Sequence, residues 1–110
     1  MLLFGGDYRN VLSRFRDDAR IRRFALLFLK DSSKQELCSS MEQGKAEEAF
    51  RAAHTLKGVC QNLGFSRLGA VSSEMTEFLR AGRLEEAEQF LPQLQEEYDN
   101  IILALKALDV

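Results

Sequence analysis

The sequence predicts an all-α fold, an antiparallel up-and-down four-helix bundle with an additional short N-terminal helix. Only one proline, Pro92, interrupts the 110 residues, and no stretch shows the sustained period-two alternation of a half-buried strand. Gly44, Gly64 and Gly82 each follow a run with helical periodicity, where left-handed C-terminal caps are expected. Because the connections between these runs are short, neighbouring helices should be antiparallel.

The first two predicted helices lie before Gly44. Asp7 can cap a short helix that runs through about Phe15. A long second helix should run from about residue 17 to residue 43, with Ser32 and Ser33 as a local weak point. The side chains expected to face the core from this second helix are Ile21, Phe24, Ala25, Phe28 and Leu29.

Three further helices follow. The third should span about 45–63, and the fourth should extend from Ser66, a favourable N-cap, to about Ala81. The fifth should span about 83–108 and contains Pro92, which removes one backbone donor. We expect a bend there, because apolar residues keep a helical spacing on both sides of the proline: Leu91, Leu94, Tyr98, Ile101, Ile102 and Leu105.

Composition narrows the class of protein. A length of 110 residues fits one domain, 1–110, and the 45% hydrophobic and 29% charged content is ordinary for a globular protein. A formal charge of −2 gives no sign of nucleic-acid binding. No apolar run is long enough for a membrane span, and the N-terminus lacks the basic lead of a signal peptide. We therefore expect a cytoplasmic protein in which Cys38 and Cys60 are reduced thiols.

The third predicted helix has two distinct faces. On a helical wheel, a stripe of mostly small residues occupies about 100° of arc and should face the core. His54, the single histidine, lies about 130° from the centre of this stripe. Glu47, Gly58 and Gln61 share its side, and Lys57 lies at the boundary. The predicted core stripe consists of Ala46, Ala49, Ala53, Leu56, Cys60 and Leu63.

This arrangement suits a phosphorylated histidine. Imidazole is a competent nucleophile near neutral pH. Lys57, at i+3 from His54, can bring its ammonium to phosphoryl oxygens. Gly58, at i+4, costs about 0.5–1 kcal/mol relative to alanine inside a helix. A reason to keep glycine there is to leave space beside His54 for a partner's active site.

The run Ala53-His54-Thr55-Leu56-Lys57-Gly58, followed by Asn62-Leu63-Gly64, resembles the signature of histidine-containing phosphotransfer (HPt) domains. The resemblance extends over nearly the whole chain, since the order and spacing of the helices also match. It implies a helical bundle with a phosphohistidine at His54, on Nε2, and with Lys57 close to the phosphoryl group. It also implies that Gly58 lets a receiver domain dock, where Gln61 and Glu47 are either partner contacts or plain solvated surface.

One position departs from the family pattern. Members often carry Gln or Glu on the next helix, where it hydrogen-bonds the other imidazole nitrogen. By spacing that position is Thr76, whose shorter side chain reaches only through water or not at all. Arg80, one turn further on, either adds positive charge near the phosphoryl group or is an ordinary solvated arginine.

The resemblance implies a phosphorelay function. The chain would carry a phosphoryl group on His54 between receiver domains of response regulators, or from a hybrid histidine kinase. It has no nucleotide-binding motif, so we expect a phosphocarrier and not an enzyme. We expect a monomer with no bound cofactor, no nucleic-acid partner and no membrane partner, with Mg²⁺ held by the receiver. Two alternatives stay open: an HPt-like receiver-binding module that carries no phosphate, and a purely structural helical protein.

Overall fold

The computed structural model describes residues 19–107, with the side chains of residues 22–23 and 26–106, and every regular element in that range is a helix. The prediction of an all-α fold is therefore confirmed. The predicted short helix from Asp7 to Phe15 lies outside the described residues. The helices are α2 (Ala19–Lys30), α3 (Ser33–Glu42), α4 (Ala46–Leu63), α5 (Ser66–Arg80), α6 (Leu84–Glu88) and α7 (Leu91–Ala107).

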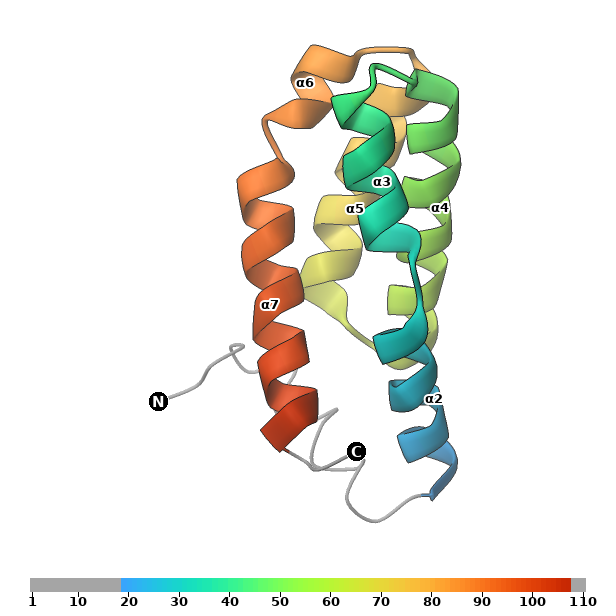
Figure 1. Ribbon diagram of the computed structural model, residues 1–110, viewed down its shortest axis with the longest axis vertical. Helices are drawn as coiled ribbons and strands as arrows, with labels where there is room; N and C mark the ends of the chain where they lie inside the picture. Colours follow the sequence, from blue (N-terminus) through green and yellow to red (C-terminus); the bar gives the residue numbers. More distant parts are fainter. Residues whose placement is uncertain (1–18, 108–110) are drawn as a thin grey trace.

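The described helices form an up-and-down bundle (Figure 1). α2 and α3 run in one direction, α4 returns, α5 runs back, and α7 returns again. The short α6 lies across one end, between α5 and α7. α4 packs against α3 and α5 more extensively than against any other described helix. No helix in the range 19–107 is both long enough and apolar enough to cross a bilayer.

Three glycines end helices or turns as predicted. Gly44, Gly64 and Gly82 have φ values of 72°, 75° and 74°, a left-handed conformation that a side chain with a Cβ rarely adopts. Gly64 caps α4, and its backbone N–H donates to the carbonyl of Cys60. The boundaries of α4 agree with the prediction to within one residue.

The predicted long helix over residues 17–43 is wrong, because the helix is interrupted between α2 and α3. The carboxylate of Asp31 accepts a hydrogen bond of 2.8 Å from the backbone N–H of Ser33, the first residue of α3. The N–H of Asp31 donates to the carbonyl of Phe28 at 3.1 Å, which tightens the last turn of α2. A short acidic side chain thus offers the backbone an alternative to the helical ladder.

The expectation of a bent but continuous helix over residues 83–108 is also wrong. α6 ends at Glu88 and α7 begins at Leu91. A proline ring clashes with the carbonyl four residues earlier, and four residues before Pro92 is Glu88. Pro92 itself lies in the first turn of α7, where its missing N–H would have had no helical partner.

The start of α5 differs from the prediction in one detail. Ser66 was expected to be the N-cap, but Phe65 occupies that position and Ser66 is the first helical residue. No side-chain hydrogen bond caps the helix there. The Phe65 ring is instead fully buried and packs edge-on against Phe28, with the ring centroids 5.1 Å apart. Apolar burial, rather than a hydroxyl cap, fixes this turn.

The core lies between α3, α4, α5 and α7, with Phe28 of α2 reaching into it. Phe28, predicted to face the core, is 1% exposed, and Leu29 packs at the margin. The side chains of Ile21, Phe24 and Ala25 are outside the described set. The largest fully buried side chains are Phe28, Phe65, Leu37, Leu56, Leu68, Met75, Leu94, Ile101 and Leu105.

Candidate functional site

The buried face of α4 is rich in alanine. Ala49, Ala53, Leu56 and Cys60 are buried as predicted, whereas Ala46 and Leu63 are only half-buried. Ala52, which the predicted stripe omitted, is 7% exposed. Because α3 and α5 flank α4 on two sides, its buried arc is wider than a single stripe. The small side chains let both neighbours approach the α4 backbone closely.

His54 lies near the middle of α4 and is exposed. Lys57 and Gly58 follow one turn later and are half-exposed, and Gln61 follows two turns later and is exposed. Residues separated by three, four and seven positions share one face of a helix. The imidazole, the ammonium stem and the amide therefore border one strip of solvent-accessible surface.

Open space surrounds Gly58. A Cβ built onto this residue would meet none of the described atoms within 4 Å, apart from its own helical turn. Packing among residues 19–107 therefore does not require a glycine here. It leaves the α4 backbone uncovered one turn after His54, where an incoming group can approach closely.

Glu47 is engaged within its own helix. Its carboxylate accepts from the guanidinium of Arg51 at 2.6 Å, and both side chains are largely exposed, at 79% and 69%. An exposed pair of this kind contributes little to stability. Glu47 therefore lies on the His54 side of α4 with its charge partly compensated.

Thr76 is fully buried, and its hydroxyl is used inside α5. The Oγ1 atom donates a 2.6 Å hydrogen bond to the carbonyl of Ser72. The donor hydrogen of the hydroxyl is therefore committed to the helix backbone, although its oxygen could still accept. His54, in contrast, is exposed. No hydrogen bond joins Thr76 and His54 in the structure.

Arg80, already a candidate from the sequence, forms a cluster with His54 and with Phe50, which the sequence did not single out. The rings of Phe50 and His54 are stacked, with centroids 6.0 Å apart and an interplanar angle of 22°. The guanidinium carbon of Arg80 lies 5.0 Å from the centroid of Phe50. Arg80 also pairs with Glu77 at 3.3 Å. The sequence could have indicated the contact between Phe50 and His54, because Phe50 is at i−4 from His54, one turn earlier on the same face.

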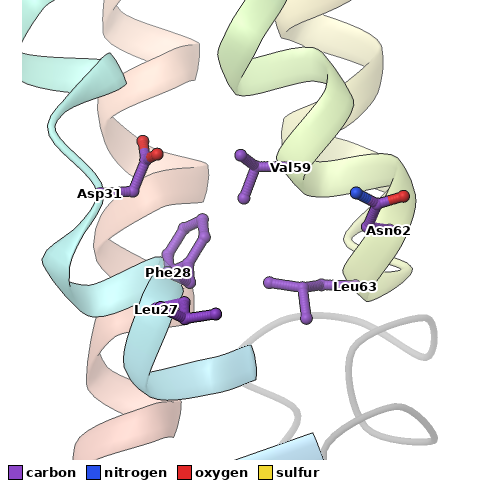
Figure 2. A pocket seen from close by; sticks show the side chains of 6 residues that line it. All are labelled: Leu27, Phe28, Asp31, Val59, Asn62 and Leu63. Carbon is purple, nitrogen blue, oxygen red and sulfur yellow. The ribbon is translucent and has the colours of Figure 1, made fainter. Parts of the chain in front are cut away.

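A separate cavity of about 490 Å³ lies between α2 and α4 (Figure 2). On a helical wheel, Val59 and Leu63 lie about 140° and 180° around α4 from His54. The cavity is therefore not part of the histidine surface. Its lining residues are Leu27, Phe28, Asp31, Val59, Asn62 and Leu63.

Neither cysteine nor any metal-ligating cluster adds to the site. Cys38 and Cys60 are free thiols in this structure. Burial, helped by the negative charge of Asp31, raises the pKa of Cys60 to about 12, so the thiol stays protonated at neutral pH. Within residues 19–107 no group of three or more His, Cys, Asp and Glu side chains is arranged to hold a metal ion.

Comparison with known proteins identifies the family. The model of the Hpt domain family matches residues 11–104, most of the chain. No curated protein and no solved structure gives a significant match. Hpt domains are helical bundles that act as phosphocarriers in phosphorelay signalling and interact with receiver domains. The exposed histidine on α4, the glycine one turn later and the family match together lead to one conclusion: the chain belongs to the Hpt domain family.

Proposed function

We propose that His54 is the phosphorylated residue, and that the chain carries a phosphoryl group between receiver domains or from a hybrid histidine kinase. The observation that carries the proposal is the α4 surface itself. A single histidine is exposed in mid-helix, Lys57 lies one turn later, and Gly58 leaves open space beside them. Family membership supports the same reaction class.

The reaction is an in-line phosphoryl transfer. The lone pair of the His54 Nε2 atom attacks the phosphorus of a receiver's phosphoaspartate. A P–N bond forms, the P–O bond of the acyl phosphate breaks, and the aspartate leaves as a carboxylate. The imidazole gives up its remaining N–H proton to solvent, and transfer to the next receiver reverses these steps. Mg²⁺ bound by the receiver neutralises the charge that develops on the phosphoryl oxygens.

Each neighbour of His54 has a role in this proposal. The Lys57 ammonium acts as a flexible point charge toward the phosphoryl oxygens. Gly58 admits the receiver's active site, and Gln61 and Glu47 border the docking surface. Docking is transient and buries a modest area. The chain acts as a monomer in the cytoplasm, without a bound cofactor and without kinase activity of its own.

The deciding experiment is transfer from a phosphorylated receiver in the presence of Mg²⁺. Wild type should acquire an acid-labile, alkali-stable label, and His54→Gln should acquire none while circular dichroism shows an intact helical fold. Lys57→Gln should be labelled more slowly than wild type. Label that persists in His54→Gln would place the phosphate elsewhere and overturn the proposal.

A second function is favoured by one observation. Thr76 is buried and makes no hydrogen bond to His54, so the ring lacks the direct hydrogen bond that a longer side chain at this position would supply. A receiver-binding module that carries no phosphate needs no oriented imidazole. Such a module would bind receivers equally well as wild type and as His54→Ala, and would take up no label from any of them. A purely structural bundle would bind no receiver at all.

A further inference from the structure

Three side chains from two helices, the histidine among them, form one cluster. Phe50 and His54 are one turn apart on α4, and Arg80 is the last residue of α5. The Phe50 ring contacts both of the others, with His54 stacked at 6.0 Å and the Arg80 guanidinium over its face at 5.0 Å. The centroid separation is within the range in which aromatic rings attract each other.

From this arrangement we propose that Phe50 and Arg80 are positioning residues for the His54 ring. The proposal rests on the proposed function and deepens it. Phe50 holds the plane of the imidazole by stacking, and Arg80 holds the Phe50 ring through a cation–π contact anchored on α5. Together they supply the orientation that Thr76, buried and bonded to Ser72, does not.

Stacking and hydrogen bonding orient a ring in different ways. A hydrogen bond to the second imidazole nitrogen occupies the ring edge and selects a tautomer. A stacked neighbour occupies the ring face, while both nitrogens lie on the edge. Phe50 therefore limits rotation of the ring and leaves both nitrogens available. One stays open to the phosphoryl group, and the other can release its proton.

Arg80 is well placed to hold Phe50. Its guanidinium pairs with Glu77 on the previous turn of α5 at 3.3 Å, so two contacts limit its motion. Phe50 is only half-buried, and the Arg80 guanidinium covers part of the ring surface that the core leaves exposed. The contact also ties the C-terminal end of α5 to the N-terminal part of α4.

The first test uses NMR to measure the contact between the Phe50 ring and the His54 ring. In wild type, the ring current of Phe50 should displace the carbon-bound proton resonances of His54. The displacement should be lost in Phe50→Leu, reduced in Arg80→Gln and retained in Phe50→Tyr. This measurement needs no receiver and no phosphate. Unchanged His54 resonances in both Phe50→Leu and Arg80→Gln would overturn the proposal.

The second test separates orientation from reactivity. With phosphoramidate, the imidazole nitrogen bonds to phosphorus, the P–N bond of the reagent breaks, and the proton released by the ring leaves with ammonia. Because this small reagent approaches from many directions, Phe50→Leu should react at the wild-type rate. Transfer from a docked receiver needs a fixed ring, so it should slow about two- to tenfold. Equal slowing in both reactions would contradict a positioning role.

Two matched controls exclude general effects of the substitutions. Arg83 is as exposed as Arg80 and also pairs with a glutamate three residues away, at 3.2 Å. Phe90 is a half-buried aromatic ring that packs on Phe78. Arg83→Gln and Phe90→Leu should leave both the His54 resonances and receiver transfer unchanged.

Failure of the proposed function would look different from failure of this inference. If the receiver labels no form of the protein, the phosphocarrier role is wrong, and the resonance measurement alone decides whether Phe50 and Arg80 orient the ring. If wild type is labelled and Phe50→Leu and Arg80→Gln are labelled equally fast, the phosphocarrier role stands and the positioning role is wrong.

Discussion

The surroundings of two helical glycines differ sharply. Gly58 in α4 has nothing within 4 Å of the place where a Cβ would be, whereas a Cβ on Gly69 in α5 would lie 3.3 Å from the Cβ of Cys60. Both residues carry the same backbone cost inside a helix. At Gly69 the contact between α4 and α5 explains that cost. At Gly58 no contact within the described part of the chain explains the cost, which is consistent with a role in binding a partner.

The largest expected effect concerns Cys60, the side chain that Gly69 touches. With a pKa near 12 instead of the ordinary 9.0, the thiolate fraction at pH 8 is lower by about a thousandfold. In a Cys38→Ala background, Cys60 should therefore react with iodoacetamide about a hundred to a thousand times more slowly than in urea, since the smaller thiolate fraction outweighs the greater nucleophilicity of a thiolate with a higher pKa. Because the folded protein favours the neutral thiol, its stability should fall as pH rises from 9 toward 12.

The labelling result also shows whether the α4–α5 contact is closed. The matched variant Cys60→Ala keeps Cys38, which is half-buried, and should react faster. If Cys60 in the folded protein reacts as rapidly as Cys38, the helices separate readily, and the close packing inferred at Gly69 does not hold in solution.

The next effect is the cost of a side chain at Gly69. Gly69→Gln should lower the free energy of unfolding by about 1–3 kcal/mol, because the new side chain meets the Cβ of Cys60, which is fixed to the α4 backbone. Urea denaturation monitored by circular dichroism measures this change in the free energy of unfolding. A value equal to that of wild type would mean that α5 can shift without cost.

The same substitution at Gly58 should act on docking instead of folding. Gly58→Gln should slow phosphoryl transfer from a receiver about tenfold, corresponding to about 1.4 kcal/mol of lost docking energy. Gly69→Ala, with its fold confirmed, serves as the control and should transfer at the wild-type rate. Unimpaired transfer by Gly58→Gln would remove the argument that this glycine admits a receiver.

The smallest effect is a gain in stability. Gly58→Ala should raise the free energy of unfolding by about 0.5–1 kcal/mol, because it relieves the helical cost of glycine and meets only open space. Thermal and urea denaturation would both register it. A loss of stability would mean that Gly58 has an internal role that the contacts do not reveal.

The sequence predicted best what depends on local backbone chemistry. The positive φ of Gly44, Gly64 and Gly82 follows from an intrinsic property of glycine, and the limits of α4 follow from its flanking residues. The two helix breaks were harder to predict, because apolar spacing continues through each of them. Only the side-chain hydrogen bond of Asp31 and the ring of Pro92 decide where the backbone leaves the helix.

Contacts between helices could not be predicted in the same way. Arg80 and Phe50 are separated by thirty positions in the sequence and meet only because α5 packs along α4. Burial of Thr76 and Ala52 likewise depends on how far the neighbouring helices wrap around α4 and α5. A helical wheel gives the direction of a side chain, but the width of the buried arc comes from the neighbours.

Because the helix is interrupted at Asp31, α2 and α3 should open as two separate cooperative units. Among the described residues, α3 packs along α4 extensively, whereas α2 packs against α4 much less. Since no continuous backbone ladder joins α2 to α3, opening α2 does not require opening α3. Amide hydrogens of α2 would then exchange with solvent through a local opening of low free energy, while those of α4 would exchange only through global unfolding.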